Sequence, residues 1–152
     1  MAHQKPKVFL DTSAVFAGIW SAQGGAFAIL RLSEEKLIEV VVGQAVLREL
    51  DTVLREKLPG KLNVALQMLD ICIAHIAAEP SASAIQWAES LIAYKPDAGV
   101  VAAALSASVD YFVTLDQKHL LGNVPLREQA PFPIGTPGDF LAWYRNFIAK
   151  QT

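Results

Sequence analysis

Four acidic residues lie far apart in the sequence but beside apolar runs, which makes them candidates for one shared site: Asp11, Glu49, Asp97 and Asp116. Asp11 ends the apolar run Val8–Leu10, and Asp116 follows shortly after the run Tyr111–Thr114. Carboxylates that gather at a buried edge repel one another unless a cation neutralises them. Mg²⁺ and Mn²⁺ prefer oxygen ligands, so the pattern predicts a site for a divalent cation of this kind.

Helical periodicity places the two middle acids. Asp97 shares an apolar stripe with Val101 and Leu105, so we expect it to face the sheet rather than water. Glu49 precedes Leu50 on the edge of a buried helix face. Taken singly, each Asp could be an ordinary helix N-cap and the Glu an ordinary helix-edge acid. The conjunction favours a shared site, because caps have no reason to occur together with a Glu at the edge of a buried face.

The elements that must position these acids alternate between short apolar runs and longer amphipathic segments. The predicted strands are Val8–Leu10, Glu39–Val42, His75–Ala77 and Tyr111–Thr114, and the predicted helices are Gln44–Leu58, Leu62–Ile73, Asp97–Ala107 and a last helix over about 137–149. Strands that are apolar on both faces and alternate with helices imply a covered parallel sheet. The fold class is therefore α/β, a three-layer α/β/α sandwich with a central, mainly parallel sheet of four or five strands. Ligands bind such sheets at the carboxyl ends of the strands.

Composition limits the possible classes of protein. The chain has 152 residues, of which 53% are hydrophobic, and its formal charge is −2, which excludes a disordered chain. We expect one domain over residues 1–152, with a core of about 7–121. No apolar run approaches the ~20 residues of a membrane span, and the basic N-terminus lacks the apolar segment of a signal peptide. The single cysteine, Cys72, excludes an internal disulfide and a multi-cysteine zinc site. We expect a cytoplasmic protein that binds no membrane.

The motifs, taken in order, resemble the PIN-domain family: Val8–Ser13, Glu49, Asp97–Ala104 and Val113–Asp116. The resemblance runs from about Val8 to Leu121. Gly24-Gly25 followed by an apolar helix is also similar to the VapC-like toxins of type II toxin–antitoxin systems. The resemblance implies an endoribonuclease that depends on Mg²⁺ or Mn²⁺, a cognate antitoxin protein as partner and a homodimer.

The resemblance also implies roles for individual residues. Asp11, Glu49, Asp97 and Asp116 match the family's acidic quartet, and Ser13 and Thr114 match small hydroxyl positions that support it. Asp11 and Asp97 are the best candidates for direct metal ligands, whereas Glu49 and Asp116 could bind directly, bind through water or help deprotonate the nucleophile. Many family members carry a further acid two residues after the fourth, where this chain has Lys118. The neighbouring His119 we interpret as a partly exposed helix residue.

An RNA substrate needs positive charge near the acids, because phosphate and carboxylate repel each other. The candidates for RNA contact are Arg48, Arg55 and Lys118, with Lys57, Lys61 and Arg127 as weaker ones. Two alternatives stay open. A non-catalytic PIN-like module that binds RNA or protein would fit the Lys118 departure. A phosphatase with an aspartyl nucleophile would also place an Asp after a strand, although such enzymes carry a second Asp where Ser13 stands.

Overall fold

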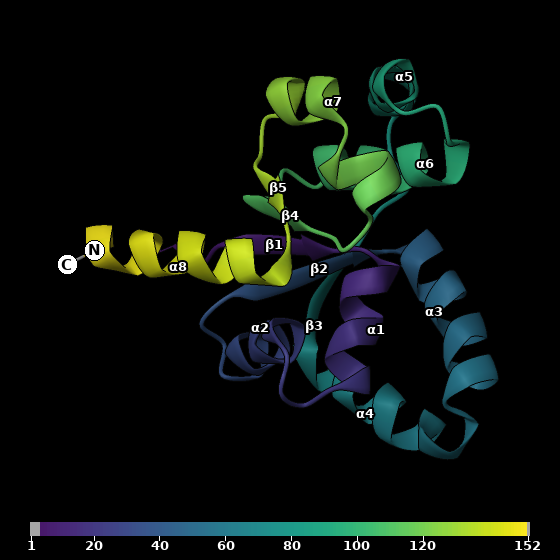
Figure 1. Cartoon of the computed structure of the whole chain (residues 1–152), viewed down its shortest axis with the longest axis vertical. Helices are drawn as coiled ribbons and strands as arrows, with labels where there is room; N and C mark the ends of the chain where they lie inside the picture. Colours follow the sequence, from purple (N-terminus) through teal and green to yellow (C-terminus); the bar gives the residue numbers. More distant parts are fainter. Residues whose placement is uncertain (1–3, 152) are drawn as a thin grey trace.

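Five parallel strands form one sheet in the order β3-β2-β1-β4-β5 (Figure 1). They are β1 (Lys7–Leu10), β2 (Glu39–Gly43), β3 (Ile73–Ala77), β4 (Tyr111–Val113) and β5 (Ile134–Gly135). The computed structural model describes residues 4–151, so residues 1–3 and 152 of the predicted domain lie outside the described residues. The sheet confirms the predicted parallel α/β/α architecture, with five strands.

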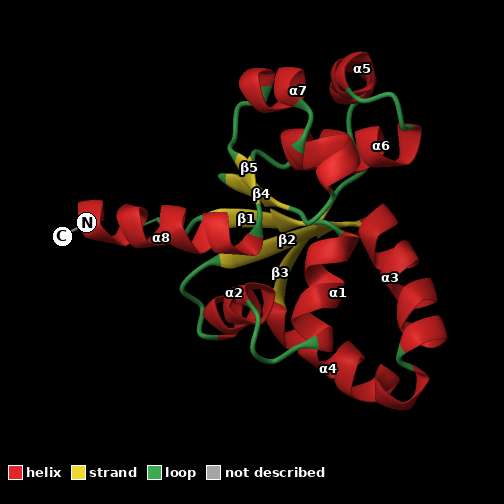
Figure 2. Cartoon of the chain, in the orientation of Figure 1, coloured by secondary structure: helices red, strands yellow, loops and turns green. Residues whose placement is uncertain are grey.

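Helices cover both faces of the sheet (Figure 2). One face carries α1 (Thr12–Trp20), α2 (Gly25–Glu34), α3 (Gln44–Lys57) and α4 (Leu62–Cys72), and α8 (Pro137–Gln151) packs against α2. The other face carries α5 (Ala82–Leu91), α6 (Lys95–Ser106) and α7 (Val124–Gln129). Between residues 4 and 151, no single helix is long and apolar enough to cross a membrane, and α1 with α2 reaches that length only as a pair bent by 91°.

The change of face follows from the strand order. The chain adds β2 and then β3 on one side of β1, and it then crosses to β4 on the other side. Since crossovers between parallel strands are right-handed, this reversal sends the later helices to the opposite face. The carboxyl ends of β1 and β4 therefore flank the point where the connections diverge, which is where ligands bind in open parallel sheets.

The core is continuous through the central strands. Phe9 of β1 is directly opposite Phe112 of β4, and their rings stack with centroids 5.2 Å apart. Phe132, in the segment that leads into β5, stacks on the other side of Phe112 at 6.1 Å. Both Phe9 and Phe112 are fully buried, so the strands that carry the first and fourth acids are packed against each other.

Element boundaries differ from the predicted ones by a few residues. The helix predicted from Asp97 begins at Lys95, because Pro96 is favourable in the first turn of a helix. The strand predicted from His75 begins at Ile73, and Pro59-Gly60, predicted as a break, forms the 3₁₀ turn η1 (Pro59–Lys61). The last helix continues to Gln151. The sequence patterns did not single out the two-residue strand β5, which is too short to show alternation.

We expect Phe112→Ala to destabilise the protein by about 3–5 kcal/mol, because it leaves a cavity between two stacked rings. Urea unfolding followed by circular dichroism measures the change. Val124→Ala, which truncates a side chain that is 59% exposed, is the control and should change the free energy of unfolding by less than about 0.5 kcal/mol. Equal effects of the two substitutions would contradict the assignment of Phe112 to the core.

Candidate active site

Asp11 is the most buried acid of the candidate site, with 8% of its surface exposed. It caps the N-terminus of α1, where one carboxylate oxygen accepts a hydrogen bond from the Ala14 N–H at 3.0 Å. The same oxygen accepts from Ser13 Oγ at 2.6 Å, and the other accepts from Thr114 Oγ1. The helix-cap interpretation of Asp11 is thus correct, and the cap also holds the carboxylate at the carboxyl end of β1.

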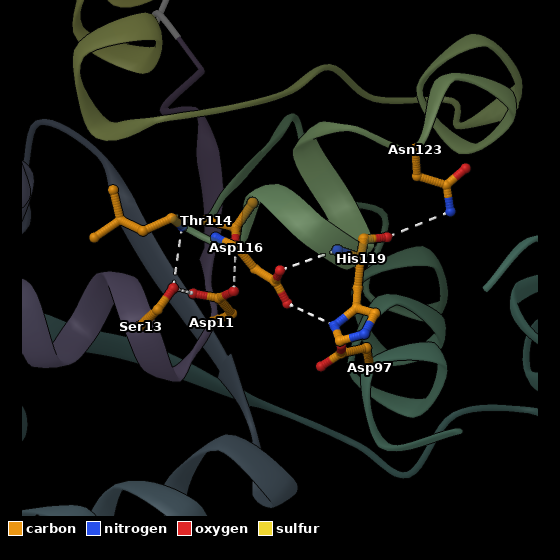
Figure 3. A network of polar contacts seen from close by, with 8 residues as sticks. Asp11, Ser13, Asp97, Thr114, Asp116, His119 and Asn123 are labelled. Atoms are coloured by element: carbon orange, nitrogen blue, oxygen red, sulfur yellow. Dashed lines mark hydrogen bonds and ion pairs between the residues drawn. The ribbon is translucent and has the colours of Figure 1, made fainter. Parts of the chain in front are cut away.

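Two hydroxyl groups connect Asp11 to the loop that follows β4 (Figure 3). The Thr114 hydroxyl, which is fully buried, donates to Asp11 and accepts from the Asp116 N–H at 3.0 Å. The Ser13 hydroxyl donates to Asp11 and accepts from the Leu115 N–H at 3.1 Å. Each hydroxyl therefore fixes a backbone group of the loop relative to the Asp11 carboxylate.

Asp97 and Asp116 both approach the ring of His119 (Figure 3). Asp116 caps η2 (Gln117–Leu121), a single π-helical turn, by accepting from the His119 N–H at 3.0 Å. His119 Nδ1 lies 3.3 Å from Asp116 Oδ2 and 3.0 Å from Asp97 Oδ2. Asp97 itself lies in the first turn of α6, whose N-cap is Tyr94, so the helix-cap interpretation of Asp97 is wrong.

The charges of the cluster are coupled. Burial raises the pKa of Asp97 to about 6, and the charges of Asp116 and Asp11 act in the same direction while His119 opposes them. Burial also raises the pKa of Asp11, although hydrogen bonds from Ser13, Thr114 and the Ala14 N–H act against it. Without a cation, this arrangement disfavours ionised carboxylates in the folded protein.

The residues present fit a divalent cation. Asp97 Oδ2 is the one buried side-chain oxygen without a hydrogen-bond donor among the residues that the structure describes. His119 Nδ1 lies close to it but makes a hydrogen bond only with Asp116, so proximity does not satisfy the oxygen. Single ligand atoms of Asp97, Asp116 and His119 all lie within 4.8 Å of one another. A cation among them would receive the unsatisfied oxygen as a ligand.

Glu49 does not join this cluster. It is exposed on α3 and makes no hydrogen bond or ion pair within the part of the chain from 4 to 151. It lines a groove of about 900 Å³ whose wall also includes Ser13 of the Asp11 network. The groove is largely apolar, with Phe16, Trp20 and Leu115 among its lining residues. Glu49 therefore faces the space beside the acids rather than contacting them.

The predicted RNA contacts lie in different environments. Arg48 and Lys118 are exposed, and Lys118 belongs to η2 beside the cluster. Arg55 is exposed and pairs with Asp51 at 3.2 Å. Arg127, a weaker candidate, donates instead to the carbonyl oxygens of Leu121 and Ile134, which are 3.0 and 2.9 Å away. Its guanidinium thus holds η2 against β5.

Sequence reasoning missed the place of His119. We interpreted it as a helix residue with a partly exposed side chain, and its exposure is indeed intermediate. Its contacts were not foreseen, although its position three residues after Asp116 puts both side chains on one side of the turn. The contact with Asp97 depends on how α6 packs, which no local pattern reveals.

Comparisons with known proteins agree with this architecture. The family model described as PIN domain matches residues 7–118. Among solved structures, the chain is similar to one in the crystal structure of VapBC2 from Rickettsia felis bound to a DNA fragment from their promoter. That match has a TM-score of 0.59 and 17% sequence identity, and it covers 85% of this chain and 96% of that chain. A search of curated proteins gives no match.

We expect Asp97→Asn to stabilise the metal-free protein at pH 7.5 by about 1–3 kcal/mol, because it removes a carboxylate that burial disfavours. The ordinary value of the Asp97 pKa is 3.8 and the folded value is about 6. Between these values the folded state holds the proton more tightly, so this group lowers stability as pH rises from about 4 to about 6. Urea unfolding in EDTA at pH 4 and pH 7.5 should show the difference only at the higher pH. Asp70→Asn, at an exposed site on α4, controls for the loss of one charge.

Thr114→Val should destabilise the protein by about 2–4 kcal/mol, because Asp11 Oδ2 loses the hydroxyl that donates to it and the Asp116 N–H loses its acceptor. Thr114→Ser keeps the hydroxyl and should cost about 1 kcal/mol for the lost methyl group. Thermal unfolding of both variants measures the difference. If the two variants were equally stable, the hydroxyl would not be what connects β1 to the β4 loop.

Proposed function

The chain belongs to the PIN domain family, and on that premise we propose that it is an endoribonuclease dependent on Mg²⁺ or Mn²⁺ and the toxin of a toxin–antitoxin pair. The observation that carries the proposal is that Asp97 and Asp116 meet, with the charge of Asp11 nearby, and that the buried Asp97 Oδ2 lacks a donor. A protein that only binds RNA gains nothing from carboxylates that repel each other and the phosphate, so the convergence favours hydrolysis over the binding-module alternative.

We propose a separate role for each residue of the site. Asp97 and Asp116 direct carboxylate oxygens toward the shared space and would hold the ion, with Asp11 beside them. When bound, the ion lowers the pKa of a coordinated water and offsets charge on the attacked phosphate. Glu49, which lines the groove, would accept a proton or hold the ion through water. Ser13 and Thr114 keep the Asp11 carboxylate oriented through their hydrogen bonds.

The RNA backbone would approach from the side where cations are exposed. Lys118 on η2 and Arg48 on α3 are exposed, and neither forms an ion pair with another described residue. Arg55 can reach phosphate only by leaving Asp51 or by sharing its charge with it. We therefore rank Lys118 and Arg48 above Arg55 as contacts that offset the repulsion between phosphate and the acids.

The apolar groove supports the antitoxin part of the proposal. An amphipathic peptide segment could bury its apolar side chains against Phe16 and Trp20. The exposed fraction of Trp20 is 60%. Because Ser13 and Glu49 line the same groove, such a segment would cover the approach to the acids.

For the homodimer, the exposed apolar residues Val64, Ile71 and Ile76 on α4 and β3 offer a candidate contact surface. We place the protein in the cytoplasm, where RNA and an antitoxin would meet it.

We expect the purified protein to cleave a pool of structured and single-stranded RNAs with Mg²⁺ or Mn²⁺ and to stop in EDTA. Asp11→Asn and Asp97→Asn should each reduce the cleavage rate by at least about 100-fold, because each removes a charge that holds the ion. Gel analysis of labelled RNA measures the rate. Asp70→Asn should cleave like the wild type.

A folded protein that binds neither metal and cleaves no RNA would overturn the nuclease proposal. Retained RNA binding in that case would support the binding-module alternative, and hydrolysis of a chromogenic phosphate ester would support the phosphatase. Folding of each variant is checked by circular dichroism, so that loss of cleavage is not confused with loss of structure.

A further inference from the structure

We propose that His119 supplies a nitrogen ligand to the metal centre, through Nδ1, together with one oxygen each from Asp97 and Asp116, and that the centre therefore prefers Mn²⁺ to Mg²⁺. The inference rests on the proposed function, since it concerns the ion that the acids would hold. It adds a ligand that is not one of the four acids and predicts which cation the site selects.

The distances from His119 Nδ1 to the two carboxylates suit one small ion. His119 Nδ1 lies 3.0 Å from Asp97 Oδ2 and 3.3 Å from Asp116 Oδ2. Neighbouring ligands of an octahedral ion with bonds of about 2.1 Å are separated by about 3 Å. Nδ1 therefore lies about as far from each carboxylate oxygen as adjacent ligands of one such ion lie from each other, and single ligand atoms of the three residues all fall within 4.8 Å.

Hydrogen bonding alone leaves this cluster incomplete. A neutral imidazole carries at most one proton on Nδ1, and that proton can point to only one of two carboxylates. The hydrogen-bond geometry is met with Asp116, and Asp97 Oδ2 remains buried without a donor. A cation that Nδ1 binds through its lone pair would let both carboxylates bind the same ion.

The imidazole is also held in place by groups that are not part of the ion site. The Tyr94 ring stacks on it, with centroids 5.2 Å apart and an interplanar angle of 19°. Asn123 Nδ2 donates to the His119 carbonyl at 3.3 Å and to the Leu91 carbonyl at 2.8 Å, which ties η2 to the end of α5. The His119 N–H occupies Asp116 Oδ1, which leaves Oδ2 directed at the ring. Ordered ligands of this kind lower the cost of assembling a metal site.

The ligand type then determines the preference among metals. Imidazole nitrogen is a good ligand for transition metals, whereas Mg²⁺ binds oxygen and keeps most of its waters. A site with two carboxylates and one imidazole should therefore bind Mn²⁺ more tightly than Mg²⁺. The negative charge of the acids would still allow Mg²⁺ to bind, only more weakly.

Pulsed electron paramagnetic resonance of Mn²⁺ bound to the tag-free protein tests the ligand directly. The wild type should show the ¹⁴N modulation of a coordinated imidazole, and His119→Asn should lose it. His75→Asn is the matched control, because His75 lies on β3 and pairs with Glu39 at 2.6 Å. Its spectrum should match that of the wild type.

Calorimetric titration gives the second readout. His119→Asn should weaken Mn²⁺ binding by at least about tenfold and change Mg²⁺ binding by less than about threefold. Mn²⁺ that binds without ¹⁴N modulation, or an unchanged preference in His119→Asn, would overturn the role of His119 and leave the metal-dependent nuclease standing. A wild-type protein that binds Mg²⁺ but no Mn²⁺ would also overturn the role of His119, and one that binds neither ion would overturn both proposals. Thermal unfolding of each variant shows that it is folded.

Discussion

The site depends on one buried carboxylate. Asp11 ends β1 at the point where the strand connections diverge, and a charge at that depth persists only if donors surround it. Its donors come from the chain immediately after β1 and from the end of β4, so satisfying Asp11 also joins the two central strands. The Thr114 and Ser13 hydroxyls also accept hydrogen bonds from the backbone N–H groups of Asp116 and Leu115, which fixes the loop relative to Asp11. The position of η2, and hence of His119, follows from the hydrogen bonds of a residue more than a hundred positions earlier in the chain.

Sequence patterns were sufficient for the parts of the structure that are locally encoded. Apolar runs located four strands, and because parallel strands share one carboxyl end, they placed Asp11 and Asp116 at the same edge of the sheet. Helical periodicity predicted that Asp97 points away from water, and its Oδ2 atom is buried. The same reasoning could not reach His119, because its contact with Asp97 is set by the packing of α6 against the opposite side of the turn. For Glu49, periodicity predicted a position at the edge of a buried helix face, but it could not predict the position relative to the other acids. The structure shows that Glu49 lines the groove and does not contact the cluster.

The cluster illustrates how a functional site and the stability of the fold can oppose each other. Phe9 and Phe112, in the core below the site, are apolar and fully buried. The edge above it holds acids whose ionised forms the folded state disfavours. A ligand that binds only the folded protein and supplies positive charge would shift the folding equilibrium in proportion to its affinity and concentration. Burial of the apolar core stabilises the fold enough to compensate for the free-energy cost of these acids.

Ser13 belongs at once to the hydrogen bonds of Asp11 and to the wall of the apolar groove. An occupant of the groove that moves this hydroxyl changes how Asp11 is held, and an occupant of the acidic edge that moves Asp11 changes the groove wall. Thermodynamic reciprocity then requires that each ligand alter the affinity of the other by the same factor. The ligands proposed for the groove and for the acidic edge would therefore be coupled through the Ser13 hydroxyl, which is common to both.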